Sequence, residues 1–164
     1  MTEGGGLRGE PIAVGDRAPD FALPAIATNG EQFEVRLSDE TRLGPVMLLF
    51  YEDDGMPICT RQLHAFAQEY ELLTEAGYRV FGMNTNGIGS HQRFQERDAY
   101  PFALISDFYG EAVKAYGMWD PDEKKSRRGV VVVGADGVVT YVLPHFNPGN
   151  VVGFEDVFKA LGLI

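Results

Sequence analysis

Cys59 is the only cysteine in the chain and the residue best suited to nucleophilic or redox chemistry. It lies in residues 51–60 (YEDDGMPICT), between an apolar run at 46–50 and a long amphipathic segment. This order predicts a buried strand, a short loop and a helix, and Pro57 is typical of a first helical turn. A thiol at that point lies near unpaired backbone N–H groups and the positive end of the helix dipole. Both favour the thiolate, the reactive form of cysteine.

A structural role for Cys59 is the alternative. Cys59, Leu63, Phe66, Tyr70 and Leu73 follow a helical 4-3-4-3 spacing, so the cysteine continues an apolar stripe. A lone cysteine on such a stripe is usually a small core residue. Its position alone therefore leaves a reactive thiol and a core thiol both open.

Composition limits the classes of function. The chain has 164 residues and a net charge of −10, so we expect one domain and no nucleic-acid or anionic-membrane partner. One cysteine excludes an intrachain disulfide and a Cys-x-x-Cys pair, and it suits a reducing compartment, so a cytoplasmic location is expected. We find no signal peptide and no apolar run of membrane-spanning length. The histidines His64, His91 and His145 lack ligand spacing, so neither a metal nor another cofactor is expected.

The remaining pattern predicts alternating strands and helices. Residues 1–13 are interpreted as a flexible tail with Gly4-Gly5-Gly6, and residues 14–164 as a single domain. Expected strands cover 32–37, 46–51, 78–85, 101–105, 130–133 and 138–143; expected helices cover 60–76, 90–97, 110–116 and 153–161, with Ser90 as an N-cap and a charged loop at 119–126. The pair Asp136-Gly137 predicts a hairpin. Together these elements indicate an α/β fold, with a central mixed β-sheet flanked by helices.

Several motifs occur in an informative order. They are residues 14–21 (VGDRAPDF), 57–60 (PICT), 90–94 (SHQRF) and 101–107 (PFALISD), together with Phe66 and Arg128. In this order and at these spacings the chain resembles the peroxiredoxins, the alkyl hydroperoxide reductase and thiol-specific antioxidant superfamily of thiol peroxidases. The nearest subgroup is the bacterioferritin comigratory and one-cysteine bacterial type. The resemblance covers about residues 12 to 162 and implies a thioredoxin-like fold.

The resemblance also implies roles for individual residues. Cys59 would attack the peroxide O–O bond and become a sulfenic acid. Arg128 would stabilise the thiolate and hold the peroxide through its N–H donors. Met56, Ile58 and backbone N–H groups near Ile58 and Cys59 would line the peroxide site. Gln62 would support Arg128, from a position where relatives often carry a glutamate.

Two loop residues depart from the family pattern. Glu52 stands where the family usually has proline, and Met56 stands where it usually has a threonine whose hydroxyl contacts the thiolate and the peroxide. A thioether has no donor to offer. The run Glu52, Asp53 and Asp54 adds negative charge, which opposes thiolate formation wherever these side chains point inward.

Arg128 belongs to a basic cluster with Lys124, Lys125 and Arg127, and a solvated loop is the default interpretation of such a cluster. Only the family register favours Arg128 as a site residue. Because neighbouring strand residues point to opposite faces, at most one of the two arginines is expected to reach Cys59. His64 and Trp119 are interpreted as an exposed residue and a packing or interface residue.

The leading hypothesis is a one-cysteine thiol peroxidase that reduces hydrogen peroxide or alkyl hydroperoxides through a sulfenic acid at Cys59. Without a resolving cysteine, that acid would be reduced by an external thiol, either a small thiol or a thioredoxin- or glutaredoxin-like protein. A homodimer fits the family. The alternative is a peroxiredoxin-fold protein with weak or no peroxidase activity that acts as a redox sensor or binding module.

Overall fold

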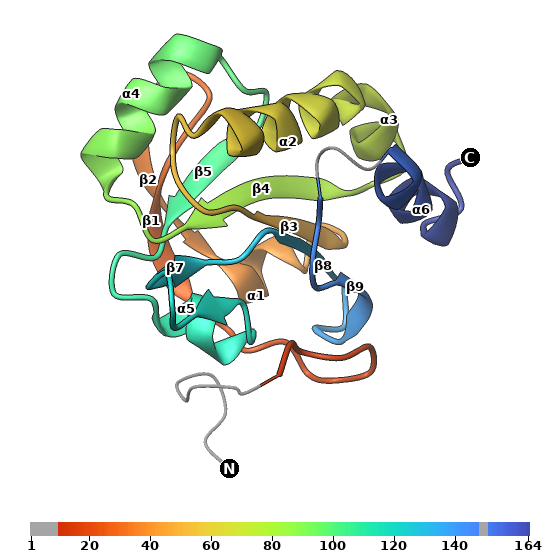
Figure 1. Cartoon of the computed structure of the whole chain (residues 1–164). Coiled ribbons are helices and arrows are strands. Elements are labelled where there is room, and N and C mark those ends of the chain that lie inside the picture. The colour runs from red at the N-terminus through yellow and green to blue at the C-terminus, as the bar shows by residue number, and fades with distance from the viewer. Residues whose placement is uncertain (1–9, 148–150) are drawn as a thin grey trace.

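A seven-stranded mixed sheet forms the centre of the protein (Figure 1), in the strand order β2-β1-β5-β4-β3-β8-β9. The structure is a computed structural model that describes residues 10–147 and 151–164, with the backbone alone at 151 and 152. The strands are β1 (Ala22–Ile26), β2 (Gln32–Arg36), β3 (Val46–Phe50), β4 (Arg79–Asn84), β5 (Ala103–Ser106), β8 (Gly129–Val133) and β9 (Val139–Leu143), and β6 (Trp119–Asp120) pairs with β7 (Lys125–Ser126) in a separate ribbon.

The three central strands are parallel, and the other pairings are antiparallel. β3 pairs with β4 and β4 with β5 in parallel, whereas β8 returns antiparallel along β3. All five residues of β3 are buried, as expected for a strand that is covered on both faces. The predicted α/β architecture with a mixed sheet is therefore confirmed.

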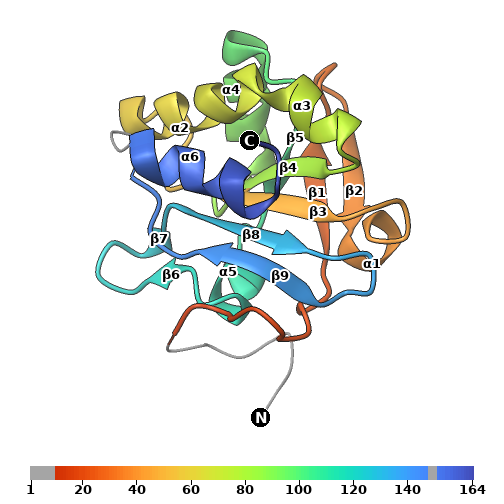
Figure 2. The same cartoon turned by 90° about the vertical axis from the view of Figure 1, so that its right-hand side faces the viewer.

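Helices cover both faces of the sheet. They are α1 (Leu37–Glu40), α2 (Pro57–Gln68), α3 (Tyr70–Glu75), α4 (Ile88–Asp98), α5 (Glu111–Ala115) and α6 (Val151–Ala160). Figure 2 shows α2, α3, α4 and α6 on one side of the sheet, and α5 with the N-terminal segment on the other. Two hydrophobic clusters match this division, because Cys59, Leu63 and Phe66 belong to one and Phe50 and Tyr116 to the other. No helix in the described part of the chain is both long enough and apolar enough to cross a bilayer.

Three sequence expectations need correction. The helix expected over 60–76 begins earlier, at Pro57, and is two helices, because Glu69 has non-helical dihedral angles between α2 and α3. Ser90 is not an N-cap: α4 begins two residues before it, and its hydroxyl donates to Asp54. The expected charged loop at 119–126 contains the β6–β7 ribbon.

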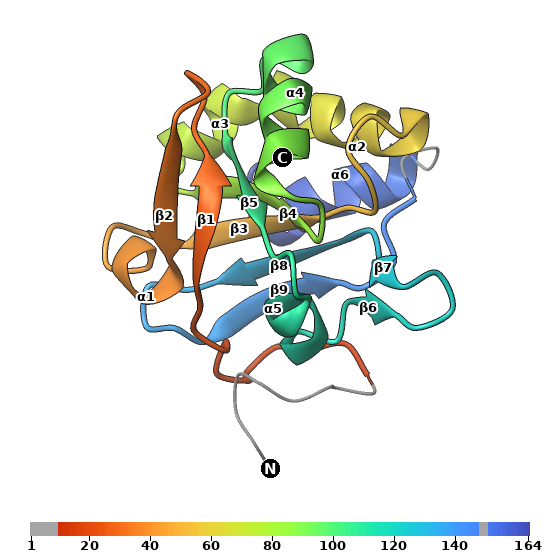
Figure 3. The ribbon, with the colours of Figure 1, turned by 90° about the vertical axis from the view of Figure 1, so that its left-hand side faces the viewer.

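A strand next to the edge of the sheet contains a proline. Figure 3 shows β1 beside β2, next to β5. Pro24 lies in the middle of β1, and β5 pairs only with Ala25 and Ile26. Pro24 pairs with Glu34 of β2 alone, so its missing N–H group interrupts no ladder on the β5 side.

The predicted flexible tail falls largely on residues 1–9, which lie outside the described residues. Ile12 is described: its side chain is buried in the core, and its N–H donates to the Tyr116 carbonyl oxygen at 3.0 Å. The packed part of the chain therefore begins before residue 14, the expected start of the domain.

Candidate active site

Cys59 is the third residue of α2, directly after the loop that leaves the end of β3. Its side chain is fully buried. Its sulfur accepts a hydrogen bond from the Glu52 backbone N–H at 3.3 Å, and its S–H donates to the Met56 sulfur, with 3.8 Å between the two sulfur atoms. Gly55 has a φ of +78°, a left-handed conformation that glycine adopts readily, and it returns the loop to the helix start. The loop therefore folds back over the thiol, as Pro57 at the first helical position also favours.

The surroundings of the thiol disfavour its ionised form. Burial raises the pKa of the Cys59 thiol to about 11, and the charges of Asp53 and Asp54 add to this increase. A hydrogen bond from the Asp53 backbone and the charge of Lys125 act in the opposite direction but are smaller than the effect of burial. At neutral pH the thiol form of Cys59 therefore predominates in this conformation.

Each of the three consecutive loop acids has its own basic partner. The Glu52 carboxylate binds the Arg128 guanidinium. The Asp53 carboxylate lies 2.8 Å from the Lys125 ammonium group. Asp54 binds His91, and this pair is almost completely buried. The acids are thus paired with bases from three separate positions in the chain, and Lys125, expected to be solvated, belongs to the site.

Asp54 is the centre of a buried hydrogen-bond network. Its carboxylate accepts hydrogen bonds from the Tyr51 and Ser90 hydroxyls at 2.7 Å each, and it lies 2.6 Å from His91 Nδ1. Burial alone would raise the pKa of Asp54, but the hydrogen bonds from His91, Tyr51 and Ser90 and the histidine charge outweigh burial, so the pKa lies below its ordinary value. This network ties the loop between β3 and α2, residues 51–56, to α4. We call this segment the cysteine loop.

His91 lies between two acceptors. Its Nδ1 faces the Asp54 carboxylate, and its Nε2 lies 2.9 Å from the Ile105 carbonyl oxygen. Both hydrogen bonds form only when the ring carries a proton on each nitrogen. No local signal marked His91 as a partner of the cysteine loop, because its own partners are 37 and 14 residues away in the chain.

Arg128 lies beside the cysteine loop, immediately before β8. Its Nη1 donates to Glu52, and its Nε donates to the Phe146 carbonyl oxygen at 3.3 Å. The link between Arg128 and the thiol thus runs through Glu52, whose backbone N–H contacts the sulfur. Arg127 differs, since its Nε is buried without a hydrogen-bond partner among the described residues.

The other predicted site residues are Gln62, Met56 and Ile58. Gln62 was expected to accept from Arg128, but its amide donates instead to the Phe50 carbonyl oxygen at 3.0 Å. Its buried Oε1 has no hydrogen-bond partner in the described part of the chain. Met56 and Ile58 are partly buried and pack against the cluster that contains Cys59. Arg128 therefore binds Glu52 and not Gln62, the residue that was expected to support it.

His64 and Trp119 lie where the sequence placed them. His64 is exposed and pairs with Asp98 at 3.3 Å, and Trp119 packs against the core with the Lys114 ammonium 4.7 Å from its ring centroid. Within residues 10–147 and 151–164 we found no group of three or more His, Cys, Asp or Glu side chains arranged to hold a metal ion.

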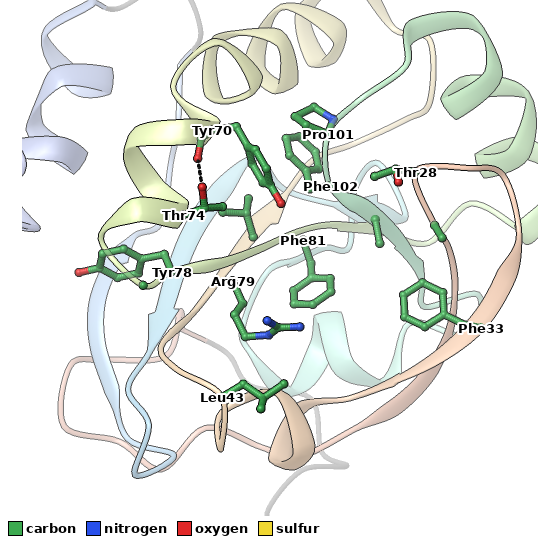
Figure 4. Close-up of a pocket in the computed structure, with 14 residues that line it drawn as sticks. Thr28, Phe33, Leu43, Tyr70, Thr74, Tyr78, Arg79, Phe81, Pro101 and Phe102 are labelled. Carbon is green, nitrogen blue, oxygen red and sulfur yellow. Dashed lines mark hydrogen bonds between the residues drawn. The ribbon is translucent and has the colours of Figure 1, made fainter.

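An open cavity of about 470 Å³ lies at the opposite ends of the central strands, away from Cys59. Figure 4 shows Phe33, Tyr70, Phe81 and Phe102 around it, with Arg79 at its floor. Cys59 lies beyond the carboxyl end of β3, whereas the cavity is lined by the first residues of β4 and β5. The cavity is therefore separate from the thiol site.

Comparison with known proteins gives a consistent result. The profile of the AhpC/TSA family matches residues 14–142. Peroxiredoxin Bcp from Escherichia coli strain K12 is 29% identical over 146 residues, covering 85% of this chain and 90% of that protein. The chloroplastic peroxiredoxin Q of Oryza sativa subsp. japonica is 31% identical over 147 residues, covering 87% of this chain but 64% of its own length.

Solved structures show the same fold. AhpC from Mycobacterium tuberculosis superimposes with a TM-score of 0.78, at 19% identity, and the match covers 93% of this chain and 99% of that one. At 19% identity, this similarity shows a shared fold and nothing about function.

Proposed function

Because this chain belongs to the AhpC/TSA family of peroxiredoxins, we propose that it is a one-cysteine thiol peroxidase that reduces hydrogen peroxide or alkyl hydroperoxides at Cys59. The observation that carries the proposal is the placement of Cys59. Its sulfur lies in the first turn of α2, accepts a backbone N–H from Glu52, and is connected through Glu52 to the Arg128 guanidinium. N–H donors and a cation beside a thiol are the groups that stabilise charge on sulfur and oxygen.

The first step is an oxygen transfer. The Cys59 thiolate attacks one peroxide oxygen, a sulfur–oxygen bond forms, and the O–O bond breaks. The leaving oxygen takes up a proton and departs as water or an alcohol. Sulfur is oxidised by two electrons to a sulfenic acid, and the peroxide is reduced by the same two electrons.

The second step needs a thiol from outside the chain, because the chain has no second cysteine. One external thiol attacks the sulfenic sulfur and releases water, which leaves a mixed disulfide. A second thiol then restores the Cys59 thiol and leaves with the first as a disulfide. A small thiol or a thioredoxin- or glutaredoxin-like protein fits this role. The homodimer and the cytoplasmic location expected from the sequence remain predictions.

Intact-mass spectrometry tests the proposal. The reduced protein, treated with one equivalent of hydrogen peroxide and a dimedone-type probe, should gain one probe adduct at Cys59. Excess peroxide without the probe should add two or three oxygen atoms to the same residue. An unmodified Cys59 after prolonged exposure would remove the peroxidase function.

A second candidate function has a specific observation in its favour. Cys59 is fully buried, and its pKa is about 11, so little thiolate exists at neutral pH. A slowly reacting thiol suits a redox sensor or binding module more than a fast peroxidase. The second-order rate of Cys59 oxidation by hydrogen peroxide separates the two: a rate no higher than that of a free small thiol favours the sensor.

A further inference from the structure

Glu52 touches both Cys59 and Arg128. Its backbone N–H donates to the Cys59 sulfur, and its carboxylate binds the Arg128 guanidinium. We propose that Glu52 is a positioning residue of the site, whose carboxylate holds the Arg128 side chain and whose negative charge restrains thiolate formation at Cys59. This inference rests on the proposed peroxidase function, because it concerns the reactivity of the same thiol.

The register of the sheet brings the two side chains together. Phe50, the last residue of β3, pairs with Gly129, the first residue of β8. Arg128, which immediately precedes Gly129, therefore lies at the same end of the sheet as the loop that contains Glu52. Two hydrogen bonds to Phe146 fix the arginine further: the Arg128 Nε donates to the Phe146 carbonyl oxygen at 3.3 Å, and the Phe146 N–H donates to the Arg128 carbonyl oxygen at 2.9 Å.

The neighbouring acids do not compete for the arginine. Asp53 binds Lys125 at 2.8 Å, and Asp54 binds His91 at 2.6 Å. Glu52 is thus the loop acid that pairs with Arg128. The two side chains are 17% and 27% exposed, so solvent screens their interaction less than it would on an open surface.

Charge neutralisation is the physical reason for the restraint. The Arg128 guanidinium is joined to the thiol through one residue, Glu52. Without the carboxylate, its positive charge would favour the thiolate, because an opposite charge favours the ionised form. When a carboxylate binds that guanidinium, the net charge of the pair is zero. Removing the carboxylate while keeping the backbone N–H should therefore leave Arg128 with uncompensated positive charge and should activate Cys59.

The experiment measures thiolate formation without peroxide. The rate of Cys59 alkylation by iodoacetamide is recorded against pH for the reduced full-length protein. In Glu52→Gln the inflection should move to lower pH by about one unit, with alkylation at pH 7 about tenfold faster. Glu52→Ala should shift in the same direction, and it supplies a second neutral variant if Glu52→Gln does not fold.

Two matched variants test whether charge is the cause. Glu52→Asp keeps the charge and should shift the inflection much less than Glu52→Gln. Glu34→Gln makes the same chemical change at an exposed residue of β2 and should leave the profile unchanged. Equal shifts in Glu52→Asp and Glu52→Gln, or a shift to higher pH in the neutral variants, would overturn the inference.

Peroxide reactions of the same variants separate this inference from the proposed function. If no variant is oxidised by peroxide but the alkylation profiles shift as expected, the peroxidase function fails and the role of Glu52 in restraining the thiolate stands. If the unmodified protein reacts with peroxide but Glu52→Gln and Glu52→Ala leave both profiles unchanged, the role of Glu52 fails and the peroxidase function stands.

Discussion

The Nδ1 atom of His91 lies 2.6 Å from a carboxylate oxygen of Asp54, and the two side chains are 0% and 4% exposed. His91 belongs to α4, and Asp54 belongs to the loop that precedes Cys59. Removing one member of a buried polar pair is costly, because the other member stays in a region of low polarity without its partner. The pair therefore fixes the cysteine loop against the helix layer.

Asp54→Asn should destabilise the protein strongly, because it removes the buried carboxylate that accepts hydrogen bonds from Tyr51 and Ser90 and faces His91 Nδ1. We expect a loss of about 3–5 kcal/mol in the free energy of unfolding at pH 7, measured by denaturant titration. Asp98→Asn is the matched control, since it removes the carboxylate from the His64–Asp98 pair, where His64 is 47% exposed. It should cost less than about 1 kcal/mol. Similar losses in both variants would show that the Asp54–His91 pair contributes little.

The stability of the protein should fall in acid partly because of Asp54. Its pKa is lower in the folded protein than in the unfolded chain, so the unfolded state binds more protons as the pH drops. The contribution of Asp54 is therefore fully present above its unfolded pKa of about 4 and is lost as the pH falls below that value. Denaturant titrations at pH 7, 5, 4 and 3 should show the difference between wild type and Asp54→Asn shrinking below about pH 4. A difference in stability that stays constant from pH 7 to pH 3 would show that Asp54 does not cause the loss of stability in acid.

The reactivity of Cys59 should rise steeply with pH. With a pKa of about 11, the thiolate fraction grows about tenfold for each pH unit between 7 and 10. Alkylation by iodoacetamide should follow this slope without a plateau below pH 10, whereas the urea-unfolded protein should level off near the ordinary cysteine pKa of about 8.5. A folded-state plateau near pH 8 would mean that an open conformation, with a solvated thiol, carries the reaction.

Arg128→Ala should move the alkylation inflection of Cys59 to higher pH, because it removes a positive charge and leaves unpaired the carboxylate of Glu52, the residue whose backbone N–H contacts the sulfur. Arg127→Ala should do much less. Alkylation profiles of both variants measure the difference. An equal or larger effect at Arg127 would show that Arg127, and not Arg128, is the arginine that acts on the thiol.

The sequence predicted the family, the sheet and the position of Cys59 at the start of a helix, because these features depend on local patterns. The apolar run 46–50 and Pro57 are local signals of a central strand and a first helical turn. The two-residue strands β6 and β7 carried no such signal, since pairing partners and not periodicity define them.

The charge pairing of the site was not predictable in the same way. Glu52 and Arg128 are 76 residues apart, and Asp53 and Lys125 are 72 apart. Their contacts follow from the antiparallel register of β3 and β8 and from the β6–β7 ribbon, which no local pattern defines. The loop acids were expected to oppose thiolate formation wherever they point inward, and the charges of Asp53 and Asp54 do raise the pKa of the Cys59 thiol. The bases that pair with these two acids come from distant parts of the chain, so the pairing itself had no local signal.

Met56 combines two roles that a substitution can separate. It is the N-cap residue of α2, but its side chain makes no capping hydrogen bond, and its sulfur lies 3.8 Å from the Cys59 sulfur. A threonine hydroxyl at this position could accept from the backbone N–H of residue 58 or 59, the usual geometry of an N-cap. The same hydroxyl could donate its proton to the thiolate or the peroxide.

Met56→Thr should therefore raise both stability and reactivity. We expect about 1 kcal/mol in the free energy of unfolding from the new cap. The rate with hydrogen peroxide should rise by about tenfold or more, because one added donor in a transition state is worth about that much or more. Met56→Val is the control: it is β-branched like threonine but has no hydroxyl, so it should give neither gain.

Rates with a small and a bulky peroxide show what Met56 does in the unmodified protein. If its thioether closes the site against water and favours a bulky apolar peroxide, Met56→Thr should speed the reaction with hydrogen peroxide and slow it with cumene hydroperoxide. Stopped-flow measurements with both peroxides on wild type, Met56→Thr and Met56→Val distinguish this from a general gain in rate. If threonine changes neither rate, residue 56 does not contact the reacting atoms, and the assignment of Met56 to the peroxide site is wrong.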